Sequence, residues 1–359
     1  MSPALPRAAT TGIAGSLSQE DNLTILHKKA SFAALGLMAM AGAMAWPAPV
    51  MAQEDIERPE LSPMSRVPAL REELETEDDR VFGGKEANKG AWPFQVALLT
   101  ANMLDDSAES QPNAQFCGGS LIAPQWVLTA AHCLYNYGEA IAPDTVVVLT
   151  EATSLDEGKR YNVAEVIVHE GYSPQTLDND IGLLKLAGPA TAPVIPMATE
   201  NVETGPATVI GWGLMENGNF PMSLMEAQID LQPNQACNTG IKEIYARDLG
   251  RILGDFSTRM RYSEAGIAEA TKAIAATMGD PLTANMLCAG IRDGARDACN
   301  GDSGGPLFAM QDGKPVQVGI VSWGEGPMDG GAACGHENAY GIYTRLANYK
   351  NWVAEKTGM

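Results

Sequence analysis

Residues 297–306 read Asp-Ala-Cys-Asn-Gly-Asp-Ser-Gly-Gly-Pro, and this short run carries most of the information about the fold. It places Ser303 in a turn that is dense in glycine. Glycine allows a backbone to bend tightly and still come close to a bound molecule. A serine nucleophile needs such a setting, because its hydroxyl must be exposed and backbone N–H groups must lie nearby to bind a developing oxyanion. Taken alone, the run is equally compatible with a polar surface loop.

Two further segments favour the nucleophile over the surface loop. Residues 128–133 read Leu-Thr-Ala-Ala-His-Cys and contain His132, and residues 177–186 read Leu-Asp-Asn-Asp-Ile-Gly-Leu-Leu-Lys-Leu and contain Asp180. The chain thus supplies a histidine, an aspartate and a serine in the order of the chymotrypsin-type triad. On these motifs the chain resembles a trypsin-like serine protease of the chymotrypsin family. The resemblance runs from about Val81 to the C-terminal helix.

The resemblance implies an all-β fold of two six-stranded antiparallel β-barrels, with the active site between them and a C-terminal helix. The sequence agrees, because short apolar runs alternate with turn signals, as is typical of closed antiparallel barrels. We place the junction of the barrels near residues 189–205 and the terminal helix at residues 349–356. The runs that we interpret as strands are 94–99, 119–122, 126–129, 145–149, 207–210 and 316–322.

The main departure from the family pattern is the long segment between Cys237 and Cys288, where the family usually has a short loop. Apolar residues recur at helical spacing over residues 241–256. A second helix is predicted to begin after Ser263, which can cap it. We therefore expect an inserted helical hairpin at about 240–283, packed beside the second barrel. It is either a structural brace or an element that shapes the substrate cleft or binds a partner.

The composition limits the classes of function. The chain has 359 residues and a formal net charge of −20 at pH 7, so nucleic acid is an unsuitable partner, because phosphate binding needs a basic surface. The negative charge is compatible with attraction of basic substrates or with a simple gain in solubility. We expect no cofactor and no metal. Residues 151–161 would correspond to the family's calcium loop, but Lys159 and Arg160 interrupt its carboxylates.

Six cysteines indicate an oxidising compartment. None of them forms the C-x-x-C pair that is typical of zinc sites. Six cysteines allow about 15 pairings, and sequence alone does not choose among them. Because disulfides persist in oxidising surroundings, we expect a secreted or periplasmic protein. The pairs that the resemblance implies are Cys117–Cys133, Cys237–Cys288 and Cys299–Cys334.

Residues 1–52 are interpreted as a signal peptide with a long leader. Lys28 and Lys29 precede an apolar stretch, residues 32–46, that ends near Val50-Met51-Ala52. A positive region, a short apolar core and a small residue before the cut describe a secretory signal. The core is short for a membrane span, so no membrane anchor is expected. An uncleaved anchor and a translation start downstream of Met1 remain alternatives.

Residues 53–80 are interpreted as an acidic activation propeptide. They contain ten acidic and four basic residues with little periodicity, so we expect a flexible segment. The resemblance implies that cleavage after Arg80 activates a zymogen, and that the new ammonium of Val81 pairs with Asp302 and orders the Gly301 turn. An ordinary acidic linker is the alternative. We expect a separate activating protease, and we expect the propeptide, which has no cysteine, to leave after cleavage.

The resemblance also assigns the chemistry. His132 takes the proton of Ser303 and returns it to the leaving amine, while Asp180 holds the imidazole in the required tautomer. The N–H groups of Gly301 and Ser303 bind the oxyanion.

Specificity is assigned to Asp297, which the resemblance places at the base of the primary pocket. A carboxylate there favours a substrate arginine or lysine, because an unpaired buried charge is costly. Ser322-Trp323-Gly324 is similar to the strand along which the substrate backbone pairs, and Gly324 and Gly341 to the small residues of the pocket walls. The sequence therefore predicts a serine endopeptidase that cuts after Arg or Lys through an acyl-enzyme. The rival is a non-catalytic binding protein on the same fold.

Overall fold

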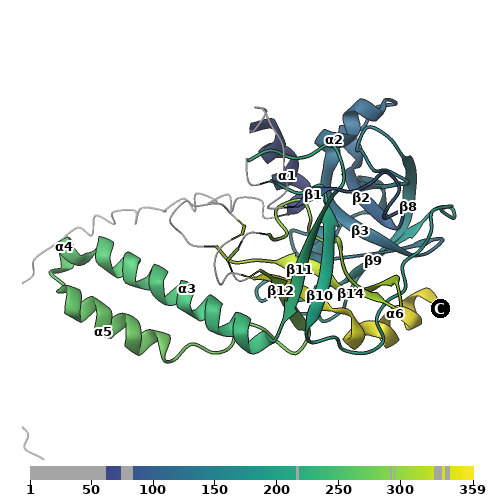
Figure 1. Ribbon diagram of the computed structural model, residues 1–359. Coiled ribbons are helices and arrows are strands. Elements are labelled where there is room, and N and C mark those ends of the chain that lie inside the picture. The colour runs from purple at the N-terminus through teal and green to yellow at the C-terminus, as the bar shows by residue number, and fades with distance from the viewer. Residues whose placement is uncertain are drawn as a thin grey trace, which may run out of the picture. The chain divides into compact units, whose positions relative to one another are not determined.

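The computed structural model describes residues 62–73, 84–215, 218–291, 293–294, 296–326, 334–335 and 340–359. All of them belong to one unit of the chain, Asp55–Met359 (Figure 1). The predicted signal peptide, the Arg80–Val81 bond and most of the loop at 325–333 lie outside the described residues.

The first barrel consists of six antiparallel strands that close in the order β2-β3-β4-β9-β8-β7. Alternating and fully apolar runs fill its interior, and Leu98, Leu121 and Leu149 are completely buried there. A two-stranded hairpin, β5 (Tyr135–Asn136) with β6 (Glu139–Ala140), lies outside it. The strands of the barrel are β2 (Gln95–Thr100), β3 (Gln115–Ala123), β4 (Trp126–Thr129), β7 (Val146–Thr150), β8 (Lys159–Val168) and β9 (Gly182–Leu186).

The second barrel consists of six antiparallel strands in the order β11-β10-β13-β14-β15-β12, and pairing of β11 with β12 closes it. The short strand β1 (Lys85–Glu86) adds to the outside of β11. Tyr343 and Leu307 are fully buried in its core. The strands are β10 (Gly205–Gly211), β11 (Met225–Gln232), β12 (Met286–Gly290), β13 (Pro306–Gln311), β14 (Lys314–Trp323) and β15 (Gly341–Arg345). The predicted pair of six-stranded barrels is therefore confirmed.

Few helices surround the barrels. The predicted terminal helix is α6 (Lys350–Thr357), preceded by the 3-10 segment η5 (Leu346–Tyr349). Across the described ranges, no helix combines the length and the apolar character that crossing a membrane requires. The remaining short elements are η1 (Ala101–Met103), η2 (Ala108–Ser110), α2 (Gln111–Ala114), η3 (Ala131–Cys133) and η4 (Pro143–Thr145).

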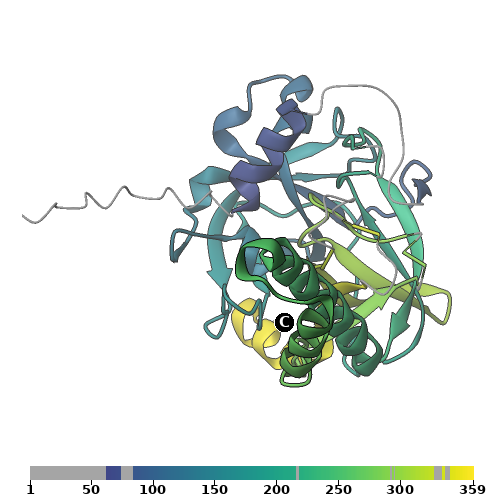
Figure 2. The same ribbon diagram turned by 90° about the vertical axis from the view of Figure 1, so that its left-hand side faces the viewer.

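The predicted helical hairpin consists of α3 (Asn234–Asp255) and α5 (Glu264–Ala275), joined by the single turn α4 (Ser257–Met260). Ser263 caps α5, since its hydroxyl accepts a hydrogen bond from the N–H of Gly266. Only the beginning of α3 is packed against the barrel, where Ile241 and Ile244 are buried, whereas Phe256 is 52% exposed. Figure 1 shows the two helices running side by side away from the barrels, and Figure 2 looks onto their far end.

Part of the acidic segment is helical, in contrast to the flexible segment predicted from the sequence. Residues Pro63–Glu73 form the helix α1, which contacts strand β3 of the first barrel. Val67 is 1% exposed and belongs to the main apolar core. The prediction of a flexible segment is therefore wrong for these residues. The segment has few apolar residues, so its sequence did not indicate that tertiary contacts bury some of its side chains.

Three disulfides link Cys117 with Cys133, Cys237 with Cys288, and Cys299 with Cys334, as the resemblance implied. The first joins β3 to the turn that carries His132. The second joins the start of α3 to β12, at the base of the helical hairpin. The third lies next to Asp297, at the start of the Ser303 loop.

Candidate active site

His132 and Asp180 meet because two neighbouring strands of the first barrel end together. Strand β4 pairs with β9, and Thr129 lies opposite Gly182. His132 follows β4 on the turn η3, and Asp180 lies directly before β9. Nδ1 of His132 lies 2.7 Å from Oδ2 of Asp180, and the backbone N–H of His132 donates to Oδ1 at 2.8 Å. The carboxylate therefore contacts both the ring and the backbone of the histidine.

The Asp180 carboxylate is held on several sides. Its side chain is fully buried, and the Ser322 hydroxyl donates to Oδ2 at 2.5 Å. The hydroxyl of Thr344 donates to the backbone carbonyl of Asp180 at 2.6 Å. Buried charge is tolerated when it is hydrogen-bonded in this way. A carboxylate fixed at Nδ1 leaves Nε2 of His132 as the ring nitrogen available for proton transfer.

Ser303 lies at the junction of the two barrels, close to Cys133, the residue that follows His132. Its carbonyl oxygen accepts a hydrogen bond of 2.8 Å from the N–H of Gly118 on β3, and it lies 3.6 Å from Sγ of Cys133. The turn needs its glycines, because Gly301 and Gly304 have φ angles of +98° and +80°. A Cβ on Gly304 would also lie 2.1 Å from the hydroxyl of Thr129.

The same turn presents two backbone donors. Among the residues that the structure describes, neither the N–H of Gly301 nor that of Ser303 donates to another protein group, whereas those of Asp302, Gly304 and Gly305 do. Unsatisfied N–H groups beside a serine hydroxyl suit the binding of an oxyanion. Gly301 and Ser303 are the residues predicted to bind the oxyanion, and that role stays a prediction.

Asp302 points into the protein rather than toward the reaction. Its Oδ1 accepts from the N–H of Gly213 at 2.8 Å and its Oδ2 from the N–H of Cys299 at 2.9 Å. Burial raises the pKa of this carboxyl to about 6. A Cβ on Gly211 would lie 2.0 Å from Oδ1 of Asp302, so only glycine fits at this position of the strand. Gly211 and Gly213 flank the buried Trp212, and neither was predicted from the sequence to belong to the site.

Asp297 is a buried carboxylate near the same loop. It is 6% exposed and accepts from the N–H groups of Ala298 at 2.8 Å and Gly335 at 3.4 Å. Burial raises its pKa to about 7. Gly341 passes so close that a Cβ there would lie 2.7 Å from Oδ1 of Asp297 and 3.1 Å from the hydroxyl of Tyr343. The described residues provide no ion pair for this carboxylate.

The segment predicted to pair with the substrate, Ser322–Gly324, lies at the end of β14 and contacts helix α3 of the hairpin. Trp323 packs in the same apolar cluster as Tyr245 of α3. The Tyr245 hydroxyl donates to Oε1 of Glu325 at 2.5 Å. The side chain of Ser322 is turned toward Asp180, so only its backbone remains for a substrate. Ser322 was predicted to bind substrate, and neither its contact with Asp180 nor the Tyr245–Glu325 contact was predicted from the sequence.

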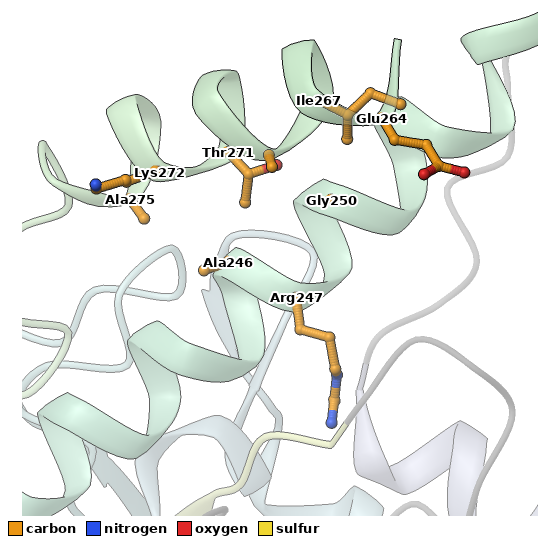
Figure 3. A pocket seen from close by; sticks show the side chains of 9 residues that line it. Ala246, Arg247, Gly250, Glu264, Ile267, Thr271, Lys272 and Ala275 are labelled. Atoms are coloured by element: carbon orange, nitrogen blue, oxygen red, sulfur yellow. The ribbon is translucent and has the colours of Figure 1, made fainter.

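Two further regions are a groove in the helical hairpin and the loop that would correspond to the family's calcium site. A groove of about 520 Å³ lies between α3 and α5, where Ala246 and Gly250 face Thr271 (Figure 3). It is made by the hairpin alone and contains none of the triad residues. In the loop that would correspond to a calcium site, Glu157 instead pairs with Lys89 at 2.8 Å and accepts from the N–H of Thr153.

Comparison with known proteins agrees with the fold and the geometry. The family model described as Trypsin matches residues 81–353. The chain is 32% identical over 289 residues to "Transmembrane protease serine 11G" of Mus musculus, covering 78% of this chain and 56% of that protein. It is 34% identical over 286 residues to "Vitamin K-dependent protein C" of Oryctolagus cuniculus (79% and 53%) and 30% identical over 290 residues to "Coagulation factor XI" of Bos taurus (77% and 38%).

The chain thus spans about half the length of the first two of these relatives, and less of the third. The matched region contains both barrels, His132, Asp180 and Ser303. The chain belongs to the trypsin family of chymotrypsin-type serine endopeptidases.

Proposed function

We propose that the protein is a secreted serine endopeptidase, made as a zymogen, that hydrolyses peptide bonds after Arg or Lys. The observation that carries the proposal is the buried Asp180, whose Oδ2 lies 2.7 Å from Nδ1 of His132 beside the Ser303 loop. A non-catalytic relative has no need for a buried carboxylate aimed at a histidine next to a serine in a glycine turn.

The reaction proceeds in two steps. Nε2 of His132 accepts the proton of the Ser303 hydroxyl while Oγ attacks the scissile carbonyl, and the N–H groups of Gly301 and Ser303 bind the oxyanion. The intermediate collapses, His132 protonates the leaving amine, and an ester to Ser303 remains. Water then attacks the ester with His132 as general base, which releases the acid and restores the serine. Asp180 stabilises the imidazolium in both steps.

Asp297 supports the preference for a basic residue. Its buried carboxylate has no cation among the described residues, and a substrate guanidinium or ammonium can supply one. Arginine gains more than lysine if both carboxylate oxygens are engaged. Gly324 and Gly341 leave room for a long side chain, and Trp323 and the backbone of Ser322 pair with the substrate chain.

The mode of activation and the location of the protein are proposed from Asp302 and from the three disulfides. Cleavage after Arg80 by another protease frees the ammonium of Val81, which pairs with Asp302. The inward-turned and buried carboxylate of Asp302 supports this pairing. Three disulfides support a secreted or periplasmic location, because they persist in oxidising compartments. The partners are protein or peptide substrates and the activating protease.

The test is cleavage of a small arginine amide by the purified full chain, before and after limited trypsin treatment and removal of the trypsin. Activity that appears together with a new N-terminus at Val81 supports zymogen, triad and pocket. A clean cut after Arg80 without activity on any side chain contradicts the enzyme and favours the binding protein. Ser303→Ala is the control, because loss of proteolysis in that variant excludes a contaminating protease.

A further inference from the structure

A buried guanidinium lies beside the catalytic loop and has no part in the proposed chemistry. Arg71 of α1 is 8% exposed. Its Nη2 donates to Oε1 of Gln115 and, at 3.2 Å, to the carbonyl of Trp212, and its guanidinium carbon lies 4.1 Å from the centre of the Phe220 ring. A carboxamide, a carbonyl and an aromatic face on the catalytic domain thus surround one cation.

The amide of Gln115 connects this cation to the oxyanion turn. Gln115 is fully buried on β3. While its oxygen accepts from Arg71, its Nε2 donates to the carbonyl of Gly301 at 2.9 Å. The guanidinium therefore fixes the orientation of an amide that itself holds the backbone of the turn.

The same cation interacts with Asp302 through its charge, although the described residues form no Arg71–Asp302 ion pair. The positive charge of Arg71 lowers the pKa of Asp302, against the larger effect of burial, and Asp302 in return raises the pKa of Arg71, which burial lowers to about 9. Trp212, whose carbonyl accepts from Arg71, precedes Gly213, whose N–H donates to Asp302. Backbone and charge therefore join Arg71 to the carboxylate from which the activation pairing is expected.

The whole helix is docked and does not rely on one contact. Val67 is 1% exposed within the main core, and the Thr100 hydroxyl donates to the carbonyl of Met64 at 3.4 Å. Arg66 reaches the side chain of Asn300 at 2.9 Å from an exposed position. Contacts of this kind position Arg71 at its site although α1 precedes the predicted cleavage bond.

We propose that the catalytic domain carries a binding site for a guanidinium, formed by Gln115, the Trp212 carbonyl and the Phe220 ring, and that in the uncleaved chain Arg71 occupies it as the counter-charge of Asp302. The ammonium of Val81 is not available before cleavage, so Arg71 and Gln115 hold the Gly301 turn in the arrangement of the uncleaved chain, and pairing of Val81 with Asp302 then rearranges it. After cleavage two cations face one carboxylate, and their repulsion loosens α1.

This inference rests on the proposed function only for the step after cleavage, so the test uses the uncleaved chain without catalysis. Amide hydrogen exchange is measured on the full chain with Ser303→Ala, which prevents self-processing. In the Arg71→Met variant, exchange at residues 299–304 is expected to rise about tenfold, while strand β4 keeps its protection. The matched control is Lys85→Met, which removes an exposed cation that pairs with Glu226 and is expected to change little at residues 299–304.

Unchanged exchange in Arg71→Met, or an equal rise in Lys85→Met, overturns the proposal. If Arg71→Met also loses the exchange protection of β4, the variant has destabilised the whole fold. In that case the exchange of Gln115→Met tests the proposal instead. That variant keeps the charge of Arg71 but removes the amide that links it to Gly301, so a rise confined to residues 299–304 supports the proposal and no rise overturns it. Because no arm measures proteolysis, an inactive protein would contradict the proposed function without affecting this result.

Discussion

The Ser322 hydroxyl donates a 2.5 Å hydrogen bond to Oδ2 of Asp180, the same oxygen that lies 2.7 Å from Nδ1 of His132. Ser322 ends a strand of the second barrel, whereas Asp180 and His132 belong to the first. The serine therefore ties the carboxylate to the barrel that also carries Ser303. Movement of one barrel against the other would disturb this contact before it disturbed either core.

Replacing Ser322 by alanine is expected to lower kcat about tenfold with little change in KM. A hydrogen bond to a charged group contributes about 1.5–3 kcal/mol, and its loss lets the Asp180 carboxylate shift relative to the imidazole. The substrate contacts only the backbone at this position. Steady-state kinetics on a small arginine amide measure both constants.

Ser120→Ala is the matched control for that experiment. Ser120 is also fully buried, and its hydroxyl donates to Gln317 at 2.6 Å away from the triad. Both variants should lower the melting temperature, but only Ser322→Ala should lower kcat. An equal loss of kcat in both would show that the Ser322 contact acts through stability alone.

The affinity for basic substrates should depend on pH through Asp297. Burial raises the pKa of its carboxyl to about 7, so the group is protonated below that pH and charged above it. A substrate guanidinium needs the charged form. KM for an arginine amide is therefore expected to rise as the pH falls below 7, by about tenfold per pH unit, whereas KM above pH 8 should be constant.

Asp297→Asn separates this effect from the titration of the triad. The variant carries no charge in the pocket, so its KM should be high and independent of pH, while kcat keeps the pH dependence of the intact enzyme. A KM that still rises in acid in Asp297→Asn would assign the dependence to another group.

The helical hairpin should influence substrates that extend along the Ser322–Gly324 strand. The Tyr245 hydroxyl holds Glu325 at 2.5 Å, next to this strand. Tyr245→Phe is expected to raise KM about threefold to tenfold for peptides that continue on the amino side of the arginine, and to leave a single-residue arginine amide unchanged. Tyr262→Phe, at an exposed position of the same hairpin, is the control. Equal effects on both substrates would exclude a role for Tyr245 in the extended site.

Short-range sequence patterns predicted the parts of this protein that local residues determine. The turns around His132 and Ser303 could be predicted because neighbouring glycines and apolar runs determine their backbone conformation. The six strand segments were recognised because each buries alternate or consecutive apolar residues. The Ser263 cap of α5 was predicted correctly for the same reason, since capping depends on neighbours in the chain.

Contacts between distant residues were not predictable in this way. Arg71 and Gln115 are 44 positions apart, and nothing in the residues around Arg71 indicates burial. The expectation that the hairpin packs beside the second barrel holds only for the start of α3, because periodicity shows which residues share a face and not what covers that face. Ile252 and Phe256 lie on the predicted apolar face and are nevertheless exposed.

The disulfides should separate stability from activity. The Cys237–Cys288 bond spans 51 residues and the Cys117–Cys133 bond 16, so the loop-closure entropy predicts losses of about 4 and about 3 kcal/mol in the free energy of unfolding when each pair is changed to alanine. Denaturant unfolding measures these losses.

For activity on a small arginine amide, we expect the opposite order, so that loss of the Cys117–Cys133 bond has the larger effect. Cys133 follows His132 directly, and its sulfur lies 3.6 Å from the carbonyl oxygen of Ser303, so loss of the Cys117–Cys133 bond frees the histidine turn and should lower kcat strongly. The Cys237–Cys288 bond holds the base of the hairpin, and kcat should stay within about twofold after its loss. A larger fall in kcat for the Cys237 and Cys288 pair would mean that the hairpin positions the catalytic residues themselves, through the cluster in which Trp323 packs.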